Sequence, residues 1–213
     1  MKKFFAIVLG AALMLAGTNA FAQFSAGAGW LNSTEKAVDN NGNSEKANLN
    51  GFYAGGQYKL PIVGGLSVAP GLYASMLFAS GSGSALWGLL QGNAKYTELA
   101  INVPVNFAYT IEIGDFEVFA YLGPNFQYAI MGKLETTDNI AGGAATLQNA
   151  KDLYSGDNKT RNPFNIYLGG GAGFQAGNIQ VILGYDHSLT NMSSQDKTQV
   201  SRSQIKIGVG YAF

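Results

Sequence analysis

The single histidine of this chain stands in Asp186-His187-Ser188, three residue types that hydrolases combine for nucleophilic catalysis. In a β-strand, adjacent side chains point to opposite faces, so Ser188 turns away from His187. The next position on the face of His187 is Leu189. We therefore interpret His187 as a histidine at the rim of a strand, and we expect no catalytic residue and no enzymatic activity.

Metal and cofactor sites are also not predicted. One histidine and no cysteine cannot supply a typical zinc cluster. The glycine run 169–173 lies in strand-like sequence with no following helix or lysine, so it does not match a phosphate-binding loop. We expect neither a metal nor a cofactor, and we interpret these glycines as a place where the sheet curves or where interior side chains pass each other.

The elements that position these residues are clearest at the C-terminus. One parity of the last nine residues is apolar or aromatic, and the other is small or polar, as in a strand with two different faces. The apolar set is Ile205, Ile207, Val209, Tyr211 and Phe213. An apolar face that ends on a terminal aromatic residue resembles the closing strand of bacterial outer-membrane barrels. Tyr211 and Phe213 are therefore our candidate signal for the barrel-assembly machinery.

The N-terminus predicts export. Lys2 and Lys3 precede an apolar run from Phe4 to Ala16, and Ala20-Phe21-Ala22 has the small-x-small form of a signal-peptidase site. The run is too short to cross a bilayer as a helix. We predict a Sec-type signal peptide over residues 1–22, cleaved on export, and an outer-membrane β-barrel domain over residues 23–213.

Composition favours the same class. Charged residues make up 12% of the chain, about half the ~25% of an ordinary soluble domain, whereas glycine is abundant (29 residues). A net charge of zero argues against nucleic acid as a partner. The absence of cysteine excludes a disulfide framework. A membrane barrel fits this composition better than a secreted β-sandwich does.

Alternation of apolar and polar residues predicts eight strands, and hence an all-β, eight-stranded antiparallel up-and-down transmembrane barrel. The predicted strands are 24–31, 50–60, 66–78, 96–113, 116–130, 164–176, 179–189 and 202–213. Short turns at 63–65, 114–115 and 177–178 alternate with long polar loops at 32–49, 79–95, 131–163 and 190–201. This pattern is typical of barrels with short periplasmic turns and long extracellular loops.

Three prolines are expected to interrupt the predicted strands. Pro70, Pro104 and Pro124 lie inside three of them. Proline lacks the donor that a strand ladder needs, and a closed barrel has no edge on which to place it. We therefore expect each proline to mark a bulge or a strand end.

The face opposite the apolar one carries small and polar residues, which suit a narrow interior. Its charged members are our candidate lumen charges: Lys59, Glu98, Glu117, Asp186, Arg202 and Lys206. Three acids and three bases could neutralise one another, and we expect Asp186 to pair with Lys206 or Arg202. Eight strands enclose a space just wide enough for side chains. The predicted filling is aromatic: Tyr53, Tyr73, Phe119, Tyr121 and Tyr167.

Several short motifs resemble one family. Pro104-Val-Asn-Phe-Ala-Tyr109 resembles a strand of the PorT-like outer-membrane β-barrel family, a small bacterial outer-membrane barrel domain. Tyr121-Leu-Gly-Pro124, followed by Met131-Gly-Lys133, resembles its Gly-Pro strand and Gly-Lys loop, and 169–174 and 184–191 resemble two later strands. Ala108 stands where the family often has lysine. The resemblance covers residues 23–213 and implies an outer-membrane barrel without implying one activity.

The function that we expect is a non-enzymatic barrel whose surface loops serve binding, adhesion or envelope integrity. A narrow outer-membrane channel and a barrel subunit of a secretion machine are the alternatives. The longest loop, 132–162, is our candidate for the specific activity, and its Ala-rich middle, Ile140–Leu153, could form a short helix. The expected partners are outer-membrane lipid, the barrel-assembly machinery and an unidentified surface or envelope partner.

Overall fold

The computed structural model describes residues 23–39, 41–82, 93–139, 146–154, 159–194 and 198–213. They form nine strands: β1 (Gln23–Asp39), β2 (Ser44–Val63), β3 (Leu66–Ser82), β4 (Asn93–Ile113), β5 (Phe116–Asn139), β6 (Thr146–Asp152), β7 (Phe164–Ala176), β8 (Ile179–Ser188) and β9 (Thr198–Ala212). No helix in this part of the chain is long and apolar enough to cross a membrane. The predicted signal peptide, residues 1–22, lies outside the described residues.

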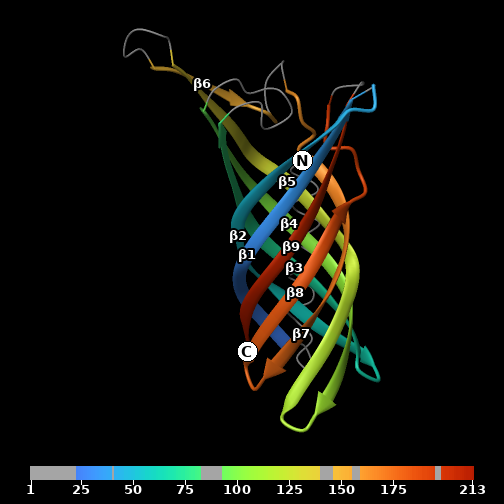
Figure 1. The fold of residues 1–213 in the computed structure, drawn as a ribbon. Helices are drawn as coiled ribbons and strands as arrows, with labels where there is room; N and C mark the ends of the chain where they lie inside the picture. Colours follow the sequence, from blue (N-terminus) through green and yellow to red (C-terminus); the bar gives the residue numbers. More distant parts are fainter. Residues whose placement is uncertain (1–22, 40, 83–92, 140–145, 155–158, 195–197) are drawn as a thin grey trace, which may run out of the picture.

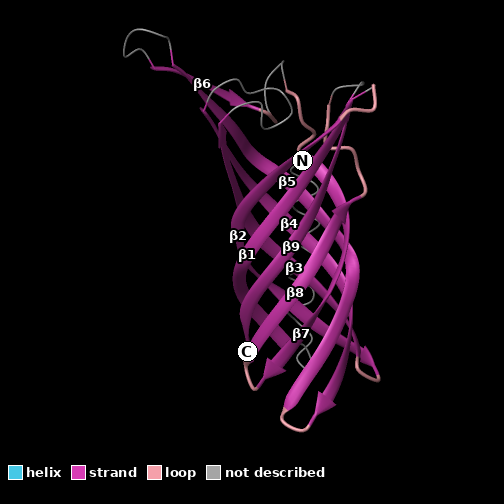
Figure 2. Cartoon of the chain, in the orientation of Figure 1, coloured by secondary structure: helices cyan, strands magenta, loops and turns pink. Residues whose placement is uncertain are grey.

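Eight of the nine strands close into a ring (Figures 1 and 2). Each pairs antiparallel with its neighbour, and β1 closes the ring by pairing with β9 from Ser25↔Ala212 to Asp39↔Thr198. β6 stands outside the ring and, among the described strands, pairs with β5. The predicted eight-stranded up-and-down barrel is confirmed.

The outward face of the barrel wall is apolar along its middle. Leu72, Phe107, Leu122 and Leu183 are each more than half exposed, and similar residues fill the outward positions of the neighbouring strands. A water-soluble barrel of this size turns such side chains inward. An apolar outer belt around a polar interior is the architecture of proteins that span the bacterial outer membrane, and this protein is located there.

The short turns lie together at the end of the barrel that holds the C-terminus (Figure 1). Gly114 and Gly177 adopt φ angles of +62° and +55° there. A side chain would strain this left-handed conformation, so glycine fits both two-residue turns. Their positions, 114–115 and 177–178, agree with the sequence prediction.

The other end differs from the prediction, because several predicted loop residues continue the strands. The predicted loop 32–49 is mainly a hairpin in which β1 and β2 stay paired up to Val38↔Ser44. The predicted helix within Ile140–Leu153 is also wrong, since Thr146–Asp152 is the strand β6. Backbone pairing with the extended β5 satisfies the hydrogen-bonding groups of this segment, and it outweighs the weak helical preference of an Ala-containing stretch.

The prolines do not mark bulges or strand ends, which corrects a third expectation. The register shifts lie between Pro61 and Val63 and between Leu99 and Ala100. Beside Pro70, a few residues of β3 lack a paired position on β2, and a few lack one on β4. In both pairings the register before the gap continues unchanged after it. The lost donor is therefore absorbed by a local interruption of the ladder and not by an inserted residue.

Candidate functional site

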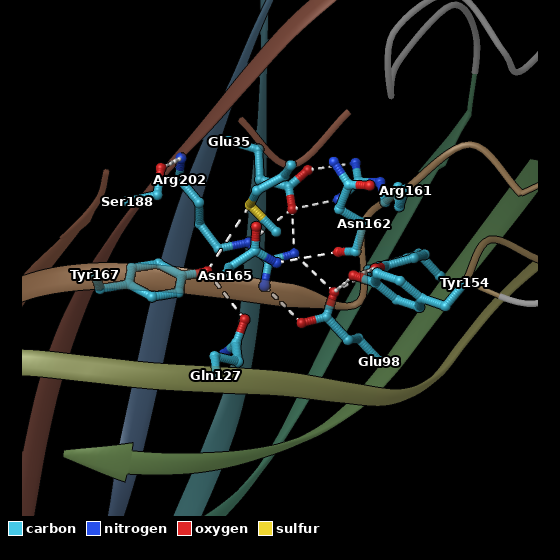
Figure 3. A network of polar contacts seen from close by, with 12 residues as sticks. Glu35, Glu98, Gln127, Tyr154, Arg161, Asn162, Asn165, Tyr167, Ser188 and Arg202 are labelled. Carbon is cyan, nitrogen blue, oxygen red and sulfur yellow. Dashed lines mark hydrogen bonds and ion pairs between the residues drawn. The ribbon is translucent and has the colours of Figure 1, made fainter. Parts of the chain in front are cut away.

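Four charged side chains meet inside the barrel near the end opposite the short turns (Figure 3). Glu35 comes from β1, Glu98 from β4 and Arg202 from β9, while Arg161 precedes β7. All four are buried, and Arg202 is 0% exposed. β1 and β4 lie three strands apart in the ring, so the cluster joins separate parts of the wall.

The two arginines bridge the two carboxylates. Arg161 donates two parallel hydrogen bonds to Glu35, of 2.8 and 2.7 Å. Arg202 donates to Glu35 Oε1 through Nε at 2.7 Å, and to Glu98 through Nη1 and Nη2 at 2.5 and 2.7 Å. The geometry is the planar, two-pronged contact that guanidinium and carboxylate groups favour. Two acids and two bases leave the cluster without net charge.

Two tyrosines complete the shell of Glu98. Tyr96 and Tyr154 donate to its Oε2 at 2.5 and 2.6 Å. Burial raises the pKa of Tyr154, so its hydroxyl keeps the proton that it donates. Burial lowers the pKa of Arg161 and is the largest single effect, but the Glu35 carboxylate, Tyr96 and Tyr154 together outweigh it, and the pKa ends well above its usual value. Arg161 therefore remains a cation inside the cluster.

Arg161 and Tyr154 belong to surface segments that fold over the barrel mouth. Arg161 N donates to Leu153 O at 3.0 Å, and Asn162 N donates to Met192 O at 2.9 Å. Leu153 and Met192 are buried, Leu153 among Leu31, Leu49 and Leu77 of the wall. We call residues 153–154, 159–163 and 189–194, together with the four charges, the plug. It closes the extracellular mouth of the described barrel.

Below the plug, neutral hydrogen bonds link inward-pointing side chains of four adjacent strands. Tyr167 donates to Gln127 Oε1 at 3.0 Å, Gln127 donates to Asn102 Oδ1 at 3.0 Å, and Asn102 donates to Ser75 Oγ at 2.8 Å. These side chains reach from β7 through β5 and β4 to β3. The chain of contacts lines one side of the lumen with polar groups that satisfy one another.

A cavity of about 100 Å³ remains between this network and the periplasmic end. Tyr53, Tyr73 and Tyr121 line it, as the sequence predicted for the lumen aromatics. Four buried polar atoms of residues that line it have no partner among the described residues: Thr110 Oγ1, Asn125 Oδ1, Gln180 Oε1 and Gln204 Nε2. The volume suits several water molecules, at about 10–15 Å³ each, and such waters would satisfy these atoms.

The structure divides the predicted lumen charges among three sites. Glu98 and Arg202 belong to the plug. Asp186 forms an ion pair with Lys206 and accepts a hydrogen bond of 3.1 Å from Asn125. Lys59 and Glu117 form a partly buried ion pair, 3.3 Å apart, near the periplasmic end.

Two members of the plug, Glu35 and Arg161, are missing from the predicted lumen set because both fall in predicted loops. The signal for Glu35 exists in the sequence. It shares the parity of Leu31 and Ser33, which also point inward, so extending the strand would have found it. Arg161 lies outside any strand, and no periodicity indicates it.

His187 lies on the outward face of β8. Its Nδ1 is 2.9 Å from Ser203 Oγ, which also accepts a hydrogen bond of 3.0 Å from Tyr185. Ser188 points inward and accepts a hydrogen bond of 2.8 Å from Arg202 N, and the neighbouring Asp186 also points inward. The three residue types of Asp186-His187-Ser188 are therefore not brought together. In the described part of the chain, no group of three ligating side chains could hold a metal ion.

The predicted assembly signal lies at the periplasmic end of the outer belt. Tyr211 and Phe213 are exposed, with their ring centres 5.0 Å apart, and Phe213 also contacts Phe24 of β1, with ring centres 5.7 Å apart. The aromatic group thus lies at the seam between the first and last strands. Its role in assembly stays a prediction.

Comparison with known proteins gives neighbours by structure only. No family model matches the sequence, and no curated protein matches it. Ail of Yersinia pestis, solved with the heparin analogue sucrose octasulfate, is 14% identical with a TM-score of 0.46, covering 90% of this chain and 99% of Ail. Neisserial surface protein A is 16% identical with a TM-score of 0.46, covering 91% and 100%. The outer-membrane enzyme PagL is 10% identical with a TM-score of 0.43, covering 85% and 98%.

Proposed function

We propose that this protein is a non-enzymatic outer-membrane barrel of the PorT-like kind that presents its extracellular strands and loops for binding, adhesion or envelope integrity. The observation that carries the proposal is the plug. Glu35, Glu98, Arg161 and Arg202 are buried across the lumen and bound to one another. A solute would have to break several charge-assisted hydrogen bonds to pass.

The extracellular extensions supply a surface for such a function. β5 continues past Tyr128↔Phe164, its last pair with β7, and pairs with β6 from Lys133↔Asp152 to Asn139↔Thr146. This hairpin projects beyond the ring in Figure 1. A rigid wall that carries projecting hairpins is a common arrangement for recognition, since the scaffold fixes the positions of variable segments.

The hairpin can be tested without disturbing the plug. Replacing residues 139–150 by a Gly/Ser linker keeps Leu153 and Tyr154, which pack in the mouth. We expect this variant to insert and to keep its heat-modifiable mobility, but to lose its partner in pull-downs from crosslinked outer membranes. A matched control replaces residues 40–43 at the tip of the β1–β2 hairpin. Partner capture retained by the first variant and lost by the control would move the activity to β1–β2.

A narrow channel is the second candidate, and the polar cavity below the plug favours it. Planar-bilayer recording separates the two functions. We expect no steady conductance from the native barrel. Reproducible single-channel steps from purified, folded protein would contradict the scaffold proposal and support a channel that opens at the plug.

A further inference from the structure

The outer face of the barrel changes character above one pair of aromatic residues. Phe52 of β2 and Phe78 of β3 pack edge to face, with ring centres 5.8 Å apart, at the upper border of the apolar belt. Above them, the outward positions of β2 are Asn50, Asn48 and Lys46, all exposed. This border is where the hydrocarbon of the membrane gives way to lipid headgroups.

A groove lies on the wall at this border. Asn48, Asn50, Phe78, Ser80, Lys95 and Thr97 line it, and its volume is about 400 Å³. These residues come from three adjacent strands, β2, β3 and β4. The groove therefore offers an aromatic edge next to the lipid, with amide, hydroxyl and ammonium groups above it.

The two asparagines are oriented by contacts with β1. Asn32 donates to Asn50 Oδ1, and Thr34 donates to Asn48 Oδ1, both at 2.9 Å. Their carbonyl oxygens are thus engaged, and the amide NH₂ groups of Asn48 and Asn50 remain as donors. A ligand that fits them must supply acceptors.

The charge around the groove is mainly positive. Lys36 on β1 is directly opposite Lys46 on β2, and both are exposed. Like charges in this position destabilise a sheet unless an anion lies between or beside them. Lys95 lines the groove, and although Glu135 of β5 is its register partner, the two form no ion pair among the described residues. The described outward positions of β1, β2 and β4 beside the groove hold three lysines, Lys36, Lys46 and Lys95, and the neighbouring β5 adds Lys133 and one acid, Glu135.

We propose that this groove binds the phosphorylated headgroup of a lipid in the outer leaflet of the membrane that the barrel spans. The groove begins where the apolar belt ends, so a lipid whose chains lie along Phe52 and Phe78 places its headgroup in it. Phosphate oxygens accept from the asparagine amides and neutralise Lys46 and Lys95. Lipid bound in this way would order the wall from which the β1–β2 hairpin rises.

Native mass spectrometry of folded protein in detergent tests the proposal, with four probes: a bisphosphorylated glycolipid, its dephosphorylated form, phosphatidylcholine and inorganic phosphate. We expect retention of the bisphosphorylated glycolipid only. The double variant Lys46→Gln/Lys95→Gln should weaken its binding by about tenfold or more. The matched double variant Lys59→Gln/Lys159→Gln removes the same charge away from the groove and should bind as the native protein does.

A further variant separates a built site from general attraction between charges. Asn50→Leu keeps the net charge and removes one donor, and it should also weaken binding. Equal losses in the two lysine double variants, or full binding by Asn50→Leu, would overturn the proposal. Competition by inorganic phosphate at the concentration of the lipid would show a free-phosphate site and overturn the lipid assignment. Heat-modifiable mobility on a gel confirms that each variant is folded.

Discussion

Arg202 shares one guanidinium between two carboxylates that belong to different parts of the barrel wall. Its bonds to Glu35 and Glu98 are buried, so the desolvation of three charges opposes the attraction between them. The net contribution of such a cluster to stability is modest, but the removal of one member leaves a buried charge without a partner. The main effect of the cluster is therefore to specify one arrangement of the strands, and its contribution to the free energy of unfolding is smaller.

A first prediction concerns this arginine. Arg202→Met should lower the free energy of unfolding by about 3–5 kcal/mol, because Glu98 loses its cationic partner inside the lumen. Adding Glu98→Gln should recover part of the loss. Urea titration of the folded protein in detergent, followed by tryptophan fluorescence, measures both changes. As a control, Lys59→Gln breaks a pair whose side chains are 24% and 29% exposed and should cost no more than about 1 kcal/mol. If Arg202→Met and the double variant with Glu98→Gln lost the same free energy of unfolding, the unpaired Glu98 carboxylate would not be the cause of the loss.

A second prediction concerns the ion pair between Asp186 and Lys206 in the β8–β9 hairpin. The register partner of Asp186 is Gln204, and Lys206 lies two residues further along β9, on the same face. Lys206→Met should destabilise the barrel, and adding Asp186→Asn should restore part of that stability, since the neutral amide no longer needs a cation. The coupling free energy from the double-mutant cycle is the measurement. A value near zero would show that the ion pair contributes nothing beyond the two separate side chains.

At the scale of the strands, the alternation of apolar and polar residues predicted the strands correctly within the apolar belt, but it predicted them poorly above the belt. Within the belt, outward residues face lipid and inward ones are polar or small, so the two parities differ sharply. Above the belt, the outward side of β1 faces water and carries Asn32, Thr34 and Lys36, while the inward side also holds a charge, Glu35. The contrast disappears although the strand continues. This is why 32–49 resembles a loop in the sequence.

The plug could not be predicted for a different reason. Arg161 and Met192 lie in connections between strands, and their contacts depend on how segments far apart in sequence cross the mouth. Arg161 and Glu35 are 126 positions apart in the chain. No local pattern encodes such a pairing. The sequence indicates that a charge is available, and only the closed ring brings its partner to it.

A third prediction uses the packing between β5 and β7. Gly173 faces Phe119 directly, and the three atoms nearest to a Cβ added there belong to the Phe119 ring, at 2.2, 2.6 and 2.9 Å. Gly173→Ala should therefore destabilise the barrel by about 1–3 kcal/mol, because a buried ring must move. Combined with Phe119→Leu, the alanine should cost less than it does alone. Additive losses in the unfolding free energies would show that the ring and the glycine are not in contact.

At the scale of the whole molecule, closure and the apolar belt act together. β1 and β9 are paired over 15 positions, so the ring has no free edge along its wall. Backbone groups in the membrane pair with neighbouring strands, apart from local interruptions such as the one beside Pro70. The apolar belt then sets the depth of the barrel in the membrane. A charged substitution in the belt should impair insertion, whereas the same substitution above the belt should not.

The fourth prediction compares two positions on the outward face of β9. Val209 lies in the belt and is 61% exposed, whereas Ser201 lies opposite Lys36, above the belt. Val209→Arg should impair insertion by placing a charge in lipid, at a cost of about 2–4 kcal/mol near mid-depth, and Ser201→Arg should insert normally. The measurement is the fraction of protein that runs faster in SDS before boiling than after, because a closed barrel resists SDS until it is heated. Equal fractions for the two arginine variants would show that Val209 does not face lipid. Identical mobility of the inserted native protein before and after boiling would contradict closure through β1 and β9.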